Sequence, residues 1–307
     1  MEAPAPAAAD PDSDHELLAP EMIARLARLA LTARKLASAR RAGRRRTRRV
    51  GNGVETIDLR PYADGDDPRR IAWHAYARLE RLLVRLVADE APQRLALVVD
   101  QSASMGFGRP SKLRHATRVA AGLAAVGLSG EDRVAVAVGS EGDARALRAV
   151  SGRSGLPRVL STLDRLAAVG ATDLPRTVRA AVDAAGGRGL TVIVSDLYEP
   201  SGVLAGAREA RLRGHDVAIV EVLAPFEIDP GESIVLDGLE LEDEETGEVV
   251  ELPASRAREG YLEALAAHRR AVDAAAAELG AVVLRTTTDE SFEAVVTRAL
   301  GQGWVRA

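Results

Sequence analysis

The sequence predicts a doubly wound α/β fold with a mainly parallel sheet. Two apolar runs end in aspartate, LALVVD at 95–100 and LTVIVSD at 190–196. Strands that are apolar throughout suit a parallel sheet covered by helices on both faces. From Arg94 onward such strands alternate with stretches of helical apolar spacing. Aromatic residues make up 3% of the chain, so we expect a core built mainly from Ala, Val and Leu.

The expected elements of this fold begin with the first apolar run. We predict strands at 95–100, 133–138, 190–195, 216–222 and 281–286. We predict helices at 111–127, 156–168, 174–186, 201–213 and 289–300. A further short strand, at 145–150, fits an antiparallel edge of the sheet. No internal repeat of about 20–50 residues interrupts this alternation.

An acidic insertion follows the fourth apolar strand, at about 224–254. Within it, residues 232–252 predict a hairpin that turns at Thr246-Gly247. A long helix is expected after it, at 255–279. The α/β domain is therefore expected to span 94–307 and to include this hairpin.

The chain before the α/β domain divides into a tail and a mixed segment. Residues 1–16 are rich in Ala, Pro and Asp and predict a disordered tail. The segment 17–93 begins with a helix at 17–42, in which apolar residues recur every three or four positions. Seven arginines and no acid follow between Arg40 and Arg49. The rest of the segment predicts strands over VETIDLRPY and RLLVRLVAD, with a short helix at 68–79 between them. The apolar positions of the helix at 17–42 are Leu18, Met22, Leu26 and Leu29.

Composition limits the class of protein and its compartment. The 307 residues are 47% apolar and 28% charged, which is ordinary for a globular protein. A net charge of −4 favours neither general nucleic-acid affinity nor attraction to a membrane. The absence of cysteine excludes disulfides and thiolate metal sites. We see no secretion signal and no run near the ~18–20 apolar residues that a membrane helix needs, so the expected location is the cytoplasm.

Five oxygen-bearing side chains are predicted to meet at one edge of the sheet. Asp100, Ser102 and Ser104 lie on the loop that leaves the first apolar strand. Thr172 precedes a helix, and Asp196 ends the second apolar run. Ligands collect at the carboxyl ends of strands in open α/β sheets, and oxygen ligands suit Mg²⁺. We therefore expect a site for Mg²⁺ or Mn²⁺, although Asp100 and Ser104 could also be loop and helix-capping residues.

This set of residues resembles the metal-ion-dependent adhesion site of von Willebrand factor A domains. The resemblance implies that the two serines and Thr172 are the nearest ligands, whereas Asp100 and Asp196 act largely through bound water. It also implies that an open coordination position on the cation takes a carboxylate from a partner protein.

A second resemblance lies upstream, in RPYADGDDPRRIAWHAYAR at residues 60–78. This block is similar to the signature of the bacterial family called domain of unknown function 58, in which it precedes an A-type domain. The acidic residue usual before the Trp is Ala72 here, which leaves any role of that carboxylate unfilled. The matching positions are Arg60, Tyr62, Gly65, Asp66, Asp67, Arg69, Ile71, Trp73, Ala77 and Arg78.

The two resemblances imply a non-enzymatic, metal-dependent protein-interaction adaptor that works with a MoxR-type AAA+ ATPase in chaperone-like assembly or maturation. The signature block has two interpretations, which are compatible: it anchors the N-terminal segment to the A-type domain, or it forms a partner-docking surface. The candidate partner-binding residues are Arg60, Tyr62, Asp66, Asp67, Arg69, Trp73 and Arg78.

Two other functional classes remain as alternatives. A phosphatase that uses Asp100 as its nucleophile needs a second Asp two residues on, where the chain has Ser102. Nucleic-acid binding through the arginines of 40–49 is possible in principle, but the segment has no interleaved aromatics. The chain contains neither G-x-S-x-G nor a P-loop motif, which argues against a serine hydrolase and a nucleotide site.

Overall fold

The computed structural model describes residues 16–43, 51–87, 92–140, 142–229, 240–242, 249–251 and 254–305. The chain divides into two compact units. One, which we call the α/β unit, comprises the chain up to Lys35 and from Gln93 onward; the other, the signature unit, spans Leu36–Pro92. The second boundary between the units falls between Pro92 and Gln93, and the first part of the N-terminal helix packs with the α/β unit.

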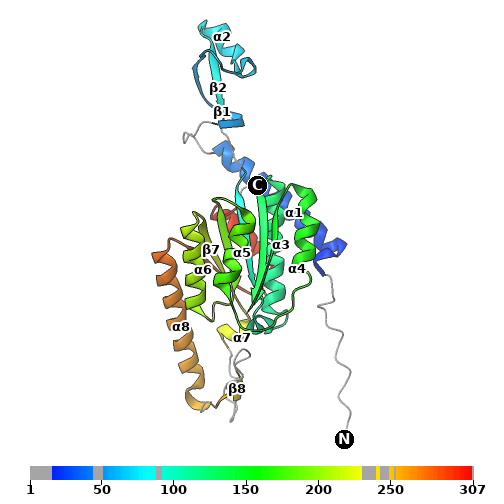
Figure 1. The fold of residues 1–307 in the computed structure, drawn as a ribbon, viewed down its shortest axis with the longest axis vertical. Helices are drawn as coiled ribbons and strands as arrows, with labels where there is room; N and C mark the ends of the chain where they lie inside the picture. The colour runs from blue at the N-terminus through cyan, green and yellow to red at the C-terminus, as the bar shows by residue number, and fades with distance from the viewer. Residues whose placement is uncertain are drawn as a thin grey trace. The chain divides into compact units, whose positions relative to one another are not determined.

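The α/β unit is built on a six-stranded sheet in the order β10-β7-β6-β3-β4-β5 (Figure 1). All neighbouring strands are parallel except β5, which pairs antiparallel with β4. The doubly wound, mainly parallel fold and its antiparallel edge strand are confirmed. The strands are β3 (Arg94–Asp100), β4 (Arg133–Ser140), β5 (Asp143–Ser151), β6 (Leu190–Ser195), β7 (Asp216–Leu223) and β10 (Val282–Thr287).

Helices cover both faces of the sheet and create two cores, as the apolar strands require (Figure 1). Successive residues of β3 alternate between the cores: Leu97 belongs to one and Val98 to the other. The first core includes residues of α1 (Pro20–Gly43), α3 (Lys112–Ser129), α4 (Leu156–Leu163) and α9 (Phe292–Gly301). The second includes residues of α5 (Leu174–Ala185), α6 (Pro200–Leu212) and α8 (Ala254–Glu278).

The N-terminal segment differs from the sequence prediction at its start. Glu16–Leu18 form a 3₁₀ turn (η1), and α1 begins only at Pro20. This turn buries Leu17 completely and leaves Leu18 exposed, although Leu18 was one of the predicted apolar positions of the first helix. Glu16 is not part of a disordered tail, because its carboxylate accepts hydrogen bonds from the Arg118 guanidinium at 2.7 and 3.0 Å.

The helix expected at 156–168 is shorter, because α4 ends at Leu163. Asp164 follows it, and its carboxylate accepts a hydrogen bond from the backbone N–H of Leu17 at 2.8 Å. Residues 166–172 then run as a loop toward the carboxyl edge of the sheet. A second short turn, η4 (Arg153–Gly155), precedes α4.

The expected acidic hairpin is present as two short paired strands. β8 (Glu240–Glu242) pairs antiparallel with β9 (Val249–Glu251), with Leu241 opposite Val250. The predicted turn at Thr246-Gly247 lies outside the described residues. A one-turn helix, α7 (Pro225–Ile228), precedes the hairpin directly after β7.

The signature unit contains a two-stranded antiparallel sheet and short helices. β1 (Gly51–Pro61) pairs with β2 (Leu83–Val87), and η2 (Pro68–Arg70) and α2 (Trp73–Leu79) lie between them in sequence. The single helix expected at 68–79 is divided, because Ile71 forms a β-bridge with Val84. Across the described parts of both units, no helix is long and apolar enough to cross a bilayer.

Candidate metal-binding site

The candidate site lies at the carboxyl edge of the sheet, where two neighbouring parallel strands end. Asp100 is the last residue of β3, and Ser195 is the last residue of β6, directly before Asp196. Because β3 and β6 are parallel, their carboxyl ends meet at the same edge. The chain leaves β3 through a 3₁₀ turn, η3 (Ala103–Gly106), before α3 begins at Lys112.

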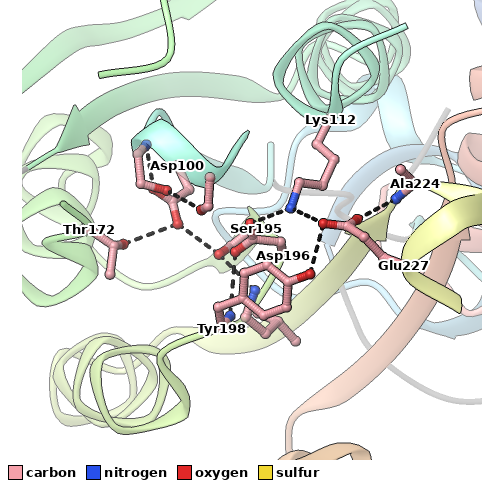
Figure 2. Close-up of polar contacts among 11 residues, drawn as sticks. Asp100, Lys112, Thr172, Ser195, Asp196, Tyr198, Ala224 and Glu227 are labelled. Carbon is pink, nitrogen blue, oxygen red and sulfur yellow. Dashed lines mark hydrogen bonds and ion pairs between the residues drawn. The ribbon is translucent and has the colours of Figure 1, made fainter. Parts of the chain in front are cut away.

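Asp100 is the centre of a group of neutral hydrogen-bond donors. Its Oδ1 accepts from the backbone N–H of Ser102 at 3.0 Å. Its Oδ2 accepts from Thr172 Oγ1 at 3.0 Å and from Ser195 Oγ at 2.7 Å (Figure 2). Burial raises the pKa of Asp100, and the nearby charge of Asp196 raises it further, whereas the three hydrogen bonds oppose the shift. A buried carboxylate in this environment would be stabilised by a bound cation.

Two backbone hydrogen bonds bring the Thr172 loop to Asp100. The Val169 N–H donates to the Gln101 carbonyl at 2.8 Å, and the Ala103 N–H donates to the Gly170 carbonyl at 2.7 Å. Gly170 has φ +70°, a conformation that L side chains rarely adopt. The glycine of the GATD segment is thus needed for the bend that carries Thr172 to the sheet edge.

The two serines lie next to each other on the loop after β3. Ser102 Oγ and Ser104 Oγ are 3.1 Å apart and form a hydrogen bond. Ser102 is fully buried, whereas Ser104 and Thr172 are partly exposed, so solvent reaches the site on the side of these two hydroxyls. Of the two residues with a loop or helix-capping alternative, Ser104 does not cap α3, because Ser111 does, whereas Asp100 accepts from the Ser102 N–H within the loop.

Asp196, the fifth predicted ligand, is engaged elsewhere. Its Oδ2 is 2.8 Å from Lys112 Nζ in an ion pair, and its Oδ1 accepts from the Tyr198 N–H at 3.3 Å. Hydrogen bonds therefore link Asp100 with Thr172, and Ser102 with Ser104 and Asp100. Asp196 is instead held by Lys112, which the sequence analysis did not include in the site.

Lys112 forms a second polar cluster beside the first. Its ammonium also contacts Glu227 Oε1 at 2.6 Å, and the Tyr198 hydroxyl donates to the same oxygen at 2.7 Å. The other carboxylate oxygen of Glu227 accepts from the Ala224 N–H at 2.6 Å. Figure 2 shows Lys112 between Asp196 and Glu227. Burial of the phenol, together with Glu227, raises the pKa of Tyr198.

Sequence reasoning missed four residues of these clusters: Ser195, Lys112, Tyr198 and Glu227. A signal existed for Ser195, which directly precedes Asp196 at the end of an apolar strand. For Lys112 the sequence offered only a weaker signal, the rarity of lysine: the chain contains two lysines among 41 basic residues. Glu227 lies 115 residues from Lys112 in sequence, and no local pattern connects the two.

The oxygen ligands present fit a hard divalent cation. Within the described parts of the chain, no group of three or more His, Cys, Asp and Glu side chains is arranged to hold a metal. The candidate ligands instead comprise one carboxylate, Asp100, and the hydroxyls of Ser102, Ser104 and Thr172. Such a set suits Mg²⁺, which binds through few carboxylates and keeps several waters.

The signature block has a hydrogen-bonded turn at its centre. Asp66 accepts two hydrogen bonds from the Arg60 guanidinium, at 2.5 and 2.7 Å, and one from the Ala63 N–H at 2.9 Å. Asp67 accepts from the backbone N–H of Arg69 rather than from an arginine side chain. Arg60 thus pairs with Asp66 across the turn of the block.

Trp73 lies at the surface of the signature unit rather than in its core. Its side chain is 58% exposed and meets Tyr76 edge-on at 6.3 Å between ring centroids. The apolar core of the signature unit consists instead of Ile71, Ala72, Ala75 and Val84. Ala72 is fully buried. A carboxylate at this position would therefore be enclosed, and alanine suits this chain's core.

The fold and the site define the class of protein: a doubly wound α/β protein with a candidate cation site at the carboxyl edge of its mainly parallel sheet. The chain belongs to the family described as "Protein of unknown function DUF58", whose model matches residues 58–271. It is 30% identical over 257 residues to an uncharacterized protein of Mycobacterium tuberculosis strain H37Rv and to one of Mycobacterium bovis strain AF2122/97. In each case the match covers 81% of this chain and 79% of the relative.

Solved structures with some likeness to the chain include two at low sequence identity. An aerotolerance-related membrane protein from Bacteroides fragilis NCTC 9343, with multiple mutations to serines, is 19% identical with a TM-score of 0.43. The match covers 68% of this chain and 98% of that one. The SpRpn10 VWA domain is 12% identical with a TM-score of 0.40, over 70% of this chain and 100% of that one.

Proposed function

We propose that this protein is a non-enzymatic adaptor that binds protein partners through a Mg²⁺ or Mn²⁺ ion at Asp100. The observation that carries the proposal is the convergence of Thr172 and Ser195 on the buried carboxylate of Asp100. Membership in the DUF58 family and the von Willebrand factor A-like fold, which commonly mediates protein interaction, support the same class of function.

Each residue of the site has a defined part in this proposal. Asp100 supplies the negative charge, and Ser102, Ser104 and Thr172 supply neutral oxygens. Ser195 orients Asp100 through its 2.7 Å hydrogen bond. When bound, the cation supplies an electrophilic position for a partner's carboxylate, and the partly exposed side at Ser104 and Thr172 is where that carboxylate enters. By its family resemblance, the partner is a MoxR-type AAA+ ATPase or a client of one.

The signature unit is proposed as a second contact surface. Large apolar side chains on and after α2 are exposed: Trp73, Tyr76, Leu79 and Leu82. Residues 36–92 contain 13 arginines and 8 acidic residues, whereas the rest of the chain contains 37 acidic and 28 basic residues. This surface therefore fits a partner that presents an apolar patch with an acidic border. The candidate partner-binding residues in this unit remain Arg60, Tyr62, Asp66, Asp67, Arg69, Trp73 and Arg78.

The first experiment tests the cation. Chelator-stripped protein is titrated calorimetrically with Mg²⁺ and with Mn²⁺, beside the variants Asp100→Ala and Ser102→Ala/Ser104→Ala. We expect saturable binding that both variants abolish. The matched control is Asp143→Ala, which removes an exposed aspartate that pairs with Arg145 and should leave binding unchanged.

The second experiment tests the partner. A purified MoxR-type ATPase from the same organism is immobilised, and the protein is captured in Mg²⁺ or in chelator. Capture that is lost both in chelator and in Ser102→Ala/Ser104→Ala supports the adaptor function. Metal binding and capture that are both indifferent to the two serines would contradict it. The variant Trp73→Ala, compared in the same assay, reports on the second surface.

A further inference from the structure

Lys112 is a cation enclosed within the fold. Its side chain is fully buried, and its ammonium is 2.8 Å from Asp196 and 2.6 Å from Glu227. It also lies 4.5 Å from the ring centroid of Tyr198 and 5.9 Å from that of Phe107. Burying an ammonium is strongly unfavourable unless opposite charges and hydrogen bonds compensate. The two carboxylates and the two rings provide that compensation.

The location of Lys112 makes its positive charge still less favourable. Lys112 is the first residue of α3, and the N-terminus of a helix carries a partial positive charge that disfavours cations. The chain has 39 arginines and two lysines, Lys35 and Lys112. Lysine is a compact point charge, whereas arginine is a wide planar fork. The buried position is thus occupied by the smaller of the two cations in a chain that otherwise uses arginine.

Asp196 connects this cation to the candidate metal site. Asp196 directly follows Ser195, whose hydroxyl donates to Asp100 Oδ2 at 2.7 Å, while Asp196 Oδ2 is 2.8 Å from Lys112 Nζ. The two clusters therefore share one electrostatic environment. Asp100, Asp196 and Glu227 carry three negative charges when ionised and Lys112 carries one positive charge, which leaves two for a divalent cation to balance.

We propose that Lys112 is the resident counter-cation of this site, and that it limits the affinity for the divalent ion by engaging Asp196. This inference rests on the proposed function, because it assumes that a divalent ion binds at Asp100. Asp100 is then the one carboxylate of the described cluster that is available to the ion. A partner's carboxylate supplies the second carboxylate ligand, so that tight metal binding depends on the partner.

The two-lysine composition offers a direct test on the unaltered protein. Protein labelled with ¹³C and ¹⁵N in lysine alone yields side-chain signals from two residues, which Lys35→Arg assigns. Mg²⁺ is titrated into the chelator-stripped protein. We expect the Lys112 side-chain signal to shift with the same midpoint as the calorimetric isotherm, while that of Lys35 stays. Calorimetric binding without a shift of the Lys112 signal overturns the inference and leaves the proposed function intact.

A variant tests the proposed limit on affinity. Lys112→Met removes the cation, and Lys112→Met/Glu227→Gln removes one charge of each sign, so that the second variant folds even if the first does not. We expect Mn²⁺ to bind at least tenfold more tightly to the double variant than to the wild type. The matched control is Arg145→Met/Asp143→Asn, an exposed pair whose loss should leave the affinity unchanged.

The outcomes separate the two proposals. Equal Mn²⁺ affinity in the wild type and the double variant overturns the role of Lys112 alone. Binding to the double variant but not to the wild type supports that role and shows that the free protein does not hold the ion. No binding to either protein overturns both the cation at Asp100 and the role of Lys112.

Discussion

The two polar clusters at the sheet edge hold buried carboxylates in different ways. Asp100 is surrounded by neutral donors, from the backbone of Ser102 and the hydroxyls of Thr172 and Ser195. Asp196 is held by an ammonium, as is Glu227. The Asp100 cluster reaches solvent through partly exposed hydroxyls, whereas Lys112 is enclosed. In the first cluster the described partners of Asp100 are neutral, so its negative charge is available to a ligand. In the second cluster Lys112 already pairs with both carboxylates.

This difference separates a binding role from a structural one. Neutral donors orient a carboxylate without cancelling its charge, so Asp100 stays attractive to a cation. An ion pair inside the fold cancels charge and makes each partner dependent on the other. Substitutions in the Lys112 cluster should therefore act first on stability, and substitutions in the Asp100 cluster first on binding.

The largest expected effect is that of Lys112→Met. Removing the ammonium leaves Asp196 and Glu227 buried without their cation, which typically costs about 3–5 kcal/mol of unfolding free energy. Urea denaturation of the metal-free protein measures this loss. Arg145→Met breaks an exposed pair and should cost less than about 0.5 kcal/mol. Equal losses of unfolding free energy in Lys112→Met and Arg145→Met would contradict the structural role of the buried cluster.

Ser195→Ala should have the next largest effect. It removes the 2.7 Å hydrogen bond to Asp100 and the acceptor of the Leu197 N–H, and both partners are buried. We expect a loss of about 1–3 kcal/mol together with weaker metal binding. Ser201→Ala removes an exposed hydroxyl that contacts Glu199 and is the matched control. Unchanged thermal unfolding in Ser195→Ala would mean that Asp100 does not need this donor.

Tyr198→Phe should have a smaller effect. It removes the 2.7 Å hydrogen bond to Glu227 but keeps the ring over Lys112, and Glu227 still accepts from Lys112 and the Ala224 N–H. The expected cost is about 0.5–1.5 kcal/mol. Comparing Tyr198→Phe with Tyr198→Leu by urea denaturation separates the hydroxyl from the ring. A larger loss in Tyr198→Phe than in Tyr198→Leu would contradict this account.

The smallest expected effect is a pH dependence that belongs to Asp100. Its folded-state pKa is raised above its ordinary value, mainly by burial, so its contribution to stability is present at low pH and is lost as the pH rises through the folded pKa. Metal-free wild type should therefore lose stability relative to Asp100→Asn as the pH increases above about 4. Saturating Mg²⁺ should remove the difference. The opposite slope would show that the hydrogen bonds outweigh burial.

Local patterns predicted the strands of the α/β unit well. The six strands of its sheet were all expected from apolar runs or a short edge segment, because burial on both faces leaves a clear signal. The ends of the helices and strands were predicted less accurately. Leu18 was included in the first helix because its spacing is helical, but it lies in the η1 turn, which buries Leu17 instead. Such a rotation depends on the surface against which the turn packs.

The signature unit shows more clearly what sequence patterns fail to predict. The pair between Arg60 and Asp66 could be foreseen, because six residues and a turn separate them. Trp73 is exposed on α2, whereas Ala75 of the same helix is buried. The sequence of a short helix does not tell which of its faces is buried, because that depends on the neighbouring elements, such as the strand whose Val84 forms a β-bridge with Ile71.

The sequence by itself determined that Asp100 and Asp196 stand at the ends of two apolar runs, and a parallel sheet places such ends at one edge. The structure added that the two strands are neighbours. Only the tertiary structure decided what each carboxylate contacts. Lys112 lies 84 residues from Asp196 and 115 from Glu227, and the three meet because α3, β6 and α7 pack around the same edge. Contacts across such separations depend on the direction of each side chain in the folded core, which no local pattern records.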